Sequence, residues 1–398
     1  MLSLADIQAA RKRIAPYVWQ TDVTHITLPN GKELYIKLEN LQYTGAYKVR
    51  GAFNCVLQLT DDQRAAGILA ASAGNHAQGV ARAARELKLK CTIVMPSGAP
   101  LSKVTATEHY GANVVLHGET YDDACRYARK LEGETGMTFI HPFDDERVMA
   151  GQGTLGLEIL SQCENVGLII VPVGGGGLAC GISTAVKESN PAIRVIGVEP
   201  SNAASMSTSI SANRIITLPS ANTIADGIAV KTPGDKTFPI CRDQLDDIVT
   251  VDEGDIANAI LYLLEKGKIV SEGAGAASIA AVLSGKLALP DDCNTVAVLS
   301  GGNIDVTMVS RIIDKGLLRS GRKVLISTRL SDKPGQLVRL LELISTTGAN
   351  IVSVSHDRSN AEMNITESSV SIELETRDRR HVFDIRSMLE DKGYQLKS

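Results

Sequence analysis

Lys48 has a residue type and a position that could carry covalent chemistry. It follows a short buried strand predicted at Leu34–Leu38 and precedes apolar residues spaced as in an amphipathic helix (Val49, Ala52, Phe53 and Val56). Thr44 and Gly45 stand where a helix cap is expected, so Lys48 falls in the first helical turn. Unpaired N–H groups make that turn electropositive, which favours the neutral amine that attacks a carbonyl and forms a Schiff base. On this stretch alone, an ordinary surface lysine is the simpler interpretation.

The consecutive glycines Gly174–Gly177 are the second feature that suggests chemistry. They follow a buried strand predicted at Leu168–Val173 and precede a helix predicted to start near Leu178. Because glycine has no Cβ, its backbone can approach an oxyanion closely, while N–H groups and the helix N-terminus supply positive potential. We interpret the run as a phosphate site in which a Cβ on Gly176 would intrude on the phosphate. The competing interpretation is a tight turn between strand and helix.

A dinucleotide cofactor would also explain the glycines. Gly174, Gly176 and Ala179 fit the pattern G-x-G-x-x-A, and Glu199 ends the next strand at a separation suited to a ribose contact. That interpretation leaves Lys48 without a role and places the fingerprint in the middle of an α/β domain. A phosphate carried by a smaller cofactor explains more of the sequence, and an NAD-dependent oxidoreductase remains the more distant alternative.

Length and composition limit the class of protein. The 398 residues suffice for several domains, and 44% hydrophobic with 22% charged residues is typical of a globular chain. A net charge of −4 gives no basic footprint for nucleic acid. The seven scattered cysteines contain no C-x-x-C pair, which favours a reducing compartment over disulfides or structural zinc. With no signal-peptide pattern and no unbroken apolar run, we expect a cytoplasmic protein without a membrane partner.

Strands and helices alternate along most of the chain. This alternation predicts an α/β fold with doubly wound parallel sheets, which bind ligands beyond the carboxyl ends of their strands. Three predicted loops lie at such ends (72–75, 174–177 and 300–303), so we expect them to converge on one cleft. A Ser- and Asn-rich stretch reaching to about residue 246 is predicted to be irregular. The predicted strands are 34–38, 68–71, 91–95, 114–117, 137–140, 168–173, 194–198, 248–251 and 295–299, and the helices are 76–87, 102–110, 121–131, 146–162, 256–266, 273–283 and 306–315.

The composition changes near residues 318–322, and a smaller α/β module follows. Its alternating residues suit a half-buried antiparallel sheet, and a βαββαβ module of this size is ferredoxin-like. We therefore predict one domain over 1–318, with a smaller subdomain inserted at about 46–145, and a separate domain over 322–398. The elements predicted for this last domain are strand 324–330, helix 335–346, strands 350–356 and 369–375, helix 379–390 and a short strand 394–396.

A lysine for a Schiff base and a cradle for one phosphate are what pyridoxal phosphate (PLP) requires. The segments that carry them closely resemble threonine dehydratase (threonine ammonia-lyase), of the tryptophan-synthase-β-like (fold type II) PLP family that includes serine racemase. The resemblance covers nearly all of residues 1–315, and residues 322–398 resemble an ACT domain, an amino-acid-sensing module. It implies two doubly wound subdomains around a PLP cleft. The matching segments are 39–52, 71–80, 171–179, 223–227 and 299–303.

The resemblance also implies a role for each residue of the site. Lys48 would hold PLP as a Schiff base and then carry the α-proton of the substrate. Asn75 would bind the 3′-oxygen of PLP and Ser300 would face its pyridine nitrogen. The phosphate would be bound by Gly174, Gly175, Gly176, Gly177 and the N–H of Leu178, and the substrate carboxylate by Ser72, Ala73, Asn75 and His76. From the residues alone, Asn75 or His76 could equally be a helix cap.

Three details refine the expected reaction. Racemases of this family carry a serine where this chain has Ala73, which has no proton to give, so racemisation is not expected. The cation site of some relatives is incomplete, because Ser205 stands where a carboxylate is expected near Glu199, and we predict no metal. As a neutral hydroxyl, Ser300 would spread carbanion charge into the ring less fully than a carboxylate, which favours elimination over transamination.

The predicted function is PLP-dependent deamination of L-threonine, and also of L-serine, to 2-oxobutanoate or pyruvate and ammonia. A serine-preferring dehydratase or a serine racemase is the alternative, since one methyl in an apolar pocket gives only about 10–200-fold discrimination. An amino-acid sensor built on an inactive PLP fold is the non-enzymatic alternative. The C-terminal resemblance implies a homodimer or homotetramer and an amino-acid effector such as isoleucine or valine.

Overall fold

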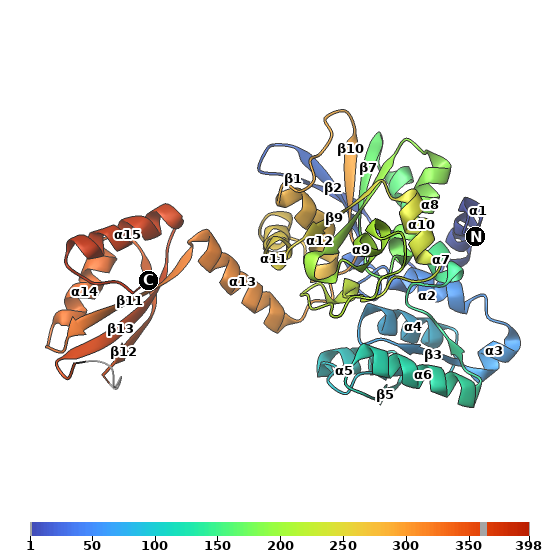
Figure 1. Cartoon of the computed structure of the whole chain (residues 1–398), viewed down its shortest axis with the longest axis horizontal. Helices are drawn as coiled ribbons and strands as arrows, with labels where there is room; N and C mark the ends of the chain where they lie inside the picture. The colour runs from blue at the N-terminus through green and yellow to red at the C-terminus, as the bar shows by residue number, and fades with distance from the viewer. Residues whose placement is uncertain (1, 359–363, 398) are drawn as a thin grey trace. The chain divides into compact units, whose positions relative to one another are not determined.

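The computed structural model describes residues 2–358 and 364–397 and divides the chain into two compact units, Met1–Asp305 and Val306–Ser398 (Figure 1). Helix α13 (Val306–Ser320) belongs to the second unit. It runs through the position at which the sequence places the domain boundary. Among the described residues, no helix combines the length and the apolar character needed to cross a membrane.

The larger sheet of the first unit has the strand order β1-β2-β10-β7-β8-β9. From β2 to β9 all neighbours are parallel, whereas β1 is antiparallel to β2. The loops after β7 and β10 therefore open at the same edge of the sheet. The strands are β1 (Val23–Thr27), β2 (Glu33–Leu38), β7 (Val166–Pro172), β8 (Arg194–Pro200), β9 (Asp247–Val251) and β10 (Asn294–Leu299).

Helices cover both faces of this sheet, as Figure 1 shows for α11 and α12 on one side and α8 and α10 on the other. A buried apolar core joins α1, α7, α8 and α10 to the inner strands. The segments that follow the strands include short helices close to the cleft. The helices are α1 (Leu4–Ile14), α7 (Glu146–Gln162), α8 (Gly177–Ser189), α9 (Ser205–Ser211), α10 (Thr237–Gln244), α11 (Glu253–Tyr262) and α12 (Gly273–Leu283), with 3₁₀ turns η1 (Glu39–Leu41), η2 (Ser201–Ala203) and η3 (Asp226–Ile228).

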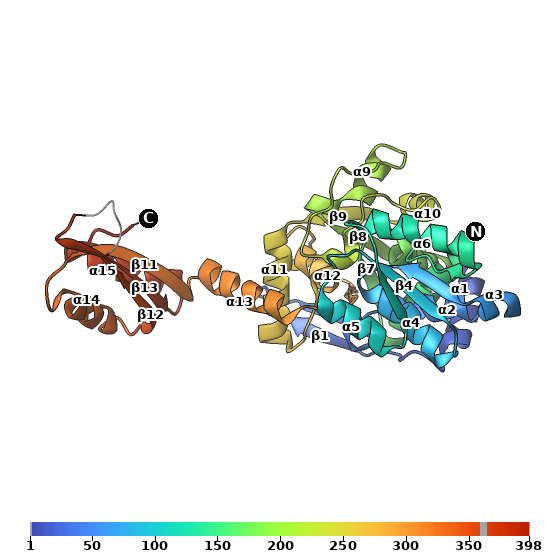
Figure 2. The same ribbon diagram turned by 90° about the horizontal axis from the view of Figure 1, so that it is seen from below.

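A smaller parallel sheet, in the order β5-β4-β3-β6, is inserted between β2 and β7 (Figure 2). Helix α6 packs on one of its faces, and α2 and α4 pack on the other. The predicted α/β fold with parallel sheets is confirmed. The elements are α2 (Lys48–Val56), α3 (Asp61–Ala66), β3 (Ile68–Ala71), α4 (Asn75–Glu86), β4 (Cys91–Met95), α5 (Leu101–His109), β5 (Asn113–Leu116), α6 (Tyr121–Thr135) and β6 (Thr138–Phe139).

The second unit is an antiparallel sheet in the order β11-β13-β12, packed against α14 and α15 through one apolar core. Residue Leu396 forms a single bridge to Thr328 where a short final strand is predicted. This arrangement is compatible with an additional domain of the predicted type, and its identity as an ACT domain stays a prediction. The elements are β11 (Lys323–Ser331), α14 (Gln336–Ser345), β12 (Asn350–Asp357), β13 (Glu367–Glu375) and α15 (Arg379–Asp391).

Three parts of the first unit differ from the sequence-based expectation. Strand β1 was not predicted, because its residues are mostly polar and exposed at a sheet edge. The stretch expected to be irregular contains α9 and α10, whose buried residues are few and do not repeat regularly along the sequence. The helix predicted at 256–266 is α11 followed by a π-helical turn, η4 (Leu263–Gly267).

Candidate active site

Lys48 is the first residue of α2, as the sequence predicts. The N-cap position is occupied by Tyr47 without a side-chain capping bond, so the expected cap at Thr44 and Gly45 is wrong. The Tyr47 N–H donates to the carbonyl oxygen of Ser300 (3.1 Å), which ties the start of α2 to the end of β10. The Nζ of Lys48 donates to the carbonyl oxygen of Pro142 (2.9 Å).

The position of Lys48 makes its amine easier to deprotonate. Burial lowers the pKa of Lys48 to about 8, and the nearby carboxylate of Glu272 opposes part of that shift. A larger fraction of the amine is therefore neutral near physiological pH than for an exposed lysine. The neutral form is the nucleophile, as expected from the placement at a helix start.

Lys48 shares a hollow of about 290 Å³ with the glycine run. The run lies between β7 and α8, and Gly176 is the N-cap of α8 with a φ of +94°. Among the described residues, no protein acceptor is found for the backbone N–H groups from Gly174 to Leu178. Free N–H groups at a helix N-terminus fit a phosphate well. The hollow is lined by Tyr47, Lys48, Phe143, Pro172, Gly174, Gly175, Gly176, Gly177, Leu178, Gly227, Ile228 and Val230.

The reason for the glycines differs from the one expected. A Cβ on Gly176 would lie 2.7 Å from Met206 Cε and 2.9 Å from Thr237 Cβ, and a Cβ on Gly175 would lie 2.4 Å from the ring of Phe143. The missing side chains thus leave room for the protein itself. Our expectation that a Cβ on Gly176 would intrude first on the phosphate is therefore corrected. The glycines press the loop against its neighbours, and the N–H groups remain free.

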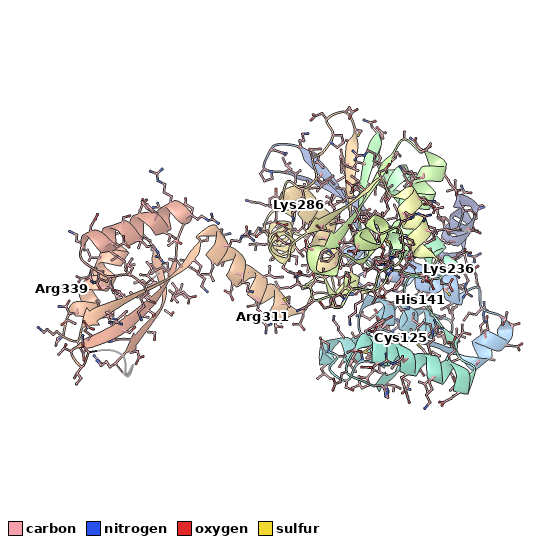
Figure 3. All side chains as sticks on the ribbon, in the orientation of Figure 1. Cys125, His141, Lys236, Lys286, Arg311 and Arg339 are labelled. Carbon is pink, nitrogen blue, oxygen red and sulfur yellow. The ribbon has the colours of Figure 1, made fainter. Side chains whose placement is uncertain are left out.

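The segment after β6 closes one side of the hollow. His141 accepts hydrogen bonds at Nδ1 from the N–H groups of Phe143 and Asp144 (3.2 and 2.7 Å), and burial lowers its pKa to about 4. The carboxylate of Asp144 accepts from the backbone N–H of Lys236 (2.9 Å), and His141 and Lys236 lie close together in Figure 3. Sequence reasoning missed this segment, because no local pattern distinguishes it from an ordinary loop.

Thr237 supports the glycine run from below. Its hydroxyl donates to the carbonyl oxygen of Gly175 (2.6 Å) and accepts from the N–H of Gly234 (3.0 Å). With its carbonyl occupied, the peptide that joins Gly175 to Gly176 is held in one orientation. Thr237 also was not predicted, since it lies far from the run in sequence.

Asn75 is the first residue of α4, and both ends of its amide are held. Its Nδ2 donates to Oε1 of Glu272 (2.6 Å), and its Oδ1 accepts from Nδ2 of Asn303 (2.8 Å). A Cβ on Gly227, a residue that lines the hollow, would be 3.9 Å from Asn75 Nδ2. The amide therefore borders the hollow, and two of the three loops predicted to converge meet through Asn75 and Asn303.

The rest of the predicted carboxylate loop leads into α4. The hydroxyl of Ser72 accepts from the N–H of Gly74 (3.2 Å), and Ala73 is half-buried. His76 is buried and its Nε2–H donates to the carbonyl oxygen of Ile140 (2.9 Å); burial lowers the pKa of His76 to about 3, so the ring is neutral. The contacts of these residues with substrate stay a prediction.

Ser300 and Glu199 complete the set of predicted residues. Ser300 is buried directly after β10, and the role of its hydroxyl stays a prediction. The buried carboxylate of Glu199 accepts from the N–H groups of Met206 and Ser207 (2.9 and 2.8 Å), and burial raises its pKa to about 7. Within 2–358 and 364–397, no group of three or more His, Cys, Asp or Glu side chains is placed to hold a metal ion.

A lysine amine facing a phosphate cradle defines a PLP site, and the sequence comparison agrees with it. The chain belongs to the pyridoxal-phosphate dependent enzyme family, which its residues 14–301 match, and PLP is its cofactor. It is 47% identical over 400 residues to L-threonine ammonia-lyase of Thermotoga maritima, covering 100% of this chain and 99% of that relative.

Two solved structures are similar to the first part of the chain. Threonine deaminase from the bacterium abbreviated T.th. is 44% identical with a TM-score of 0.72, and the match covers 76% of this chain and 99% of that one. Maize serine racemase is 37% identical with a TM-score of 0.75, and the match covers 80% of this chain and 98% of that one.

Proposed function

We propose that the chain deaminates L-threonine, and also L-serine, to a 2-oxo acid and ammonia. The observation that carries the proposal is the 47% identity to an L-threonine ammonia-lyase over the entire chain. The site agrees with it, since Lys48 lies at the hollow bordered by Gly174–Gly177.

When bound, PLP supplies a carbonyl that takes up the amine of the amino acid and a ring that accepts electrons from its Cα. The backbone N–H groups from Gly174 to Leu178 bind the phosphate, aided by the N-terminus of α8. Asn75 donates its remaining Nδ2 hydrogen to the 3′-oxygen, and Ser300 meets the ring nitrogen. These contacts fix the ring in front of Lys48.

The substrate carboxylate binds at the start of α4. Backbone N–H groups between Ser72 and Asn75 and the positive end of the helix face it, and the hydroxyl of Ser72 adds a donor. The neutral Nζ of Lys48 removes the α-proton, and loss of the β-hydroxyl follows as water. Pro142, whose carbonyl oxygen accepts from Nζ, orients the amine while it is not covalently engaged.

Steady-state kinetics with L-threonine and L-serine test the proposal. The full-length protein should release 2-oxobutanoate from threonine, and Lys48→Ala should abolish release while borohydride no longer fixes PLP to the chain. A protein that binds PLP through Lys48 and releases no 2-oxo acid from either substrate would contradict the proposed function. Covalent fixation of PLP to a different lysine would contradict the assignment of Lys48.

Similarity to serine racemase gives a reason to test that alternative. Racemisation needs a proton donor on the face of the substrate opposite Lys48, and the resemblance places Ala73 there. An alanine methyl cannot donate a proton, so we propose elimination as the dominant outcome. Chiral analysis of residual serine measures the ratio directly, and D-serine formed faster than pyruvate would reverse this assignment.

We propose further that residues 322–398 form an ACT domain that binds an amino-acid effector and takes part in a homodimer or homotetramer. The antiparallel sheet with its helices on one face supports this proposal. The shorter threonine deaminase structure, which matches only 76% of this chain, suggests that deamination belongs to the first unit. Kinetics with isoleucine and valine, and sedimentation with and without them, test the regulatory part.

A further inference from the structure

The hydrogen bonds around Asn75 have only one consistent direction. Asn303 Nδ2 lies 2.7 Å from the carbonyl oxygen of Thr44, which can only accept, so that atom is the nitrogen of the amide. The same Nδ2 group gives its second hydrogen to Asn75, which makes the facing atom Oδ1. Asn75 therefore presents its Nδ2 to Glu272 (2.6 Å). The orientation of the amide thus follows from a backbone carbonyl.

Glu272 is built into this network as a buried carboxyl. Its side chain also accepts from the backbone N–H of Asn303, and its backbone N–H donates to the carbonyl oxygen of Gly301 (3.2 Å). A Cβ on Gly301 would lie 2.4 Å from Oε1, and a Cβ on Gly227 would lie 3.5 Å from it. The carboxyl thus accounts for glycines in two segments, 223–227 and 299–303, that the phosphate site leaves unexplained.

We propose that Glu272 is a positioning residue for the cofactor. Together with Asn303 it locks the amide plane of Asn75, so that the second Nδ2 hydrogen points toward the 3′-oxygen of bound PLP, and its charge acts on Lys48 across the hollow. The proposal rests on the proposed function for the identity of the bound group. It assigns a role to a residue that no sequence motif marked.

Charged and titratable groups face Glu272 from several elements. Lys48 and Tyr47 lie on the start of α2, Asp226 on η3 and Lys103 on α5. Burial, reinforced by Asp226, raises the pKa of Glu272 to about 7, while Asn75 and Lys103 oppose the shift. Above neutral pH the carboxylate carries charge, and this charge raises the pKa of Lys48. Its removal should lower the pH at which the amine becomes a nucleophile.

Three variants separate positioning from charge, and PLP binding by the purified apoprotein is the measurement. Glu272→Gln should weaken PLP binding about tenfold or more, the usual effect of losing a hydrogen bond to a charged acceptor. It should also lower the pH midpoint of PLP capture. Asn303→Ala should weaken PLP binding but leave that midpoint unchanged, because the charge remains. Glu86→Gln, a carboxylate-to-amide change at the exposed end of α4, should alter neither.

A double-mutant cycle tests whether Glu272 acts through Asn75. In an Asn75→Ala background, Glu272→Gln should weaken PLP binding by less than about twofold more, because coupled neighbours are not additive. Additive effects, or wild-type binding and an unchanged midpoint in Glu272→Gln, would overturn the proposal. If Glu272→Gln does not fold, the cycle of Asn303→Ala with Asn75→Ala decides by the same criterion. None of these readouts uses threonine, so a wild type that binds PLP without deaminating threonine would refute only the proposed function.

Discussion

At the residue scale, the site combines groups that burial keeps uncharged. Burial lowers the pKa of Lys48 to about 8, that of His76 to about 3 and that of His141 to about 4. The two imidazoles are thus neutral at any pH near 7, and Lys48 is the base closest to its neutral form. This arrangement leaves one amine to titrate in the working range beside the carboxyl of Glu272.

The first prediction concerns the pH dependence of PLP capture. Only the neutral amine attacks the cofactor, and the depressed pKa of Lys48 means that this form grows in as pH rises through about 8 instead of the usual 10.5. The capture rate of the apoprotein, followed by absorbance in stopped flow, should therefore reach its half-maximum near pH 8. A midpoint above pH 10 would show that Lys48 is not desolvated.

The second prediction separates packing from backbone strain in the glycine run. Gly176→Ala places a methyl group within 3 Å of Met206 and Thr237 at a φ of +94°, whereas Gly285→Ala has a φ of +75° and no neighbour within 4 Å. Strain alone costs about 1–2 kcal/mol at either position. Overpacking should add about 1–3 kcal/mol at Gly176 only, seen as a lower urea midpoint and weaker PLP binding. Equal losses in the two variants would refute the packing account.

At the element scale, a buried ion network fixes α2. Arg50 donates to Glu39 (2.8 Å) and Glu158 (2.6 Å), and Lys37 donates to Glu158 (2.6 Å). The four residues come from η1, β2, α2 and α7, and all are buried. Arg50 lies two positions after Lys48, so the same network that joins these elements also anchors the start of α2.

The third prediction tests that anchor. Arg50→Met would leave Glu39 and Glu158 without their main partner, and an uncompensated buried charge costs about 3–5 kcal/mol. The free energy of unfolding in urea should fall by that amount. Arg126→Met is the control, because Arg126 is 72% exposed where it pairs with Asp123 and should change stability by less than about 1 kcal/mol. Similar losses in both variants would contradict the network account.

At the scale of the whole molecule, the chain separates deamination from its C-terminal unit. Residues 1–305 contain both parallel sheets and every residue assigned to the site, whereas the antiparallel sheet belongs to 306–398. Coupling between two sites, where it exists, is reciprocal in binding free energy. An effector that changes threonine binding must therefore be bound more tightly or more weakly in the presence of threonine.

The fourth prediction follows from this division. A chain ending at Asp305 should retain threonine deamination and lose any response to isoleucine or valine, because the proposed effector site lies in the removed unit. Initial rates and melting temperatures of the two chains over millimolar concentrations of each amino acid provide the measurement. A response that persists in the shorter chain would place the effector site in the first unit.

The local parts of the site were predictable, and the long-range parts were not. Lys48 and Gly174–Gly177 are marked by spacing between a strand and a helix, so periodicity suffices to place them. Phe143, Thr237 and Glu272 reach the hollow only after distant segments come together, and nothing in their neighbouring residues signals it. Strand β1 was missed for a related reason, since an exposed edge strand buries too little apolar surface to show a pattern.

The packing of the glycine run has a consequence for reading genomes. Because Phe143, Met206 and Thr237 occupy the space where side chains would project, a homologue that had stopped binding vitamin B6 derivatives would still be under selection to keep all the glycines. Such a homologue would pass any screen that relies on the run alone. The amine at position 48 has no comparable structural duty, so its replacement is the mark by which an inactive descendant should be recognised.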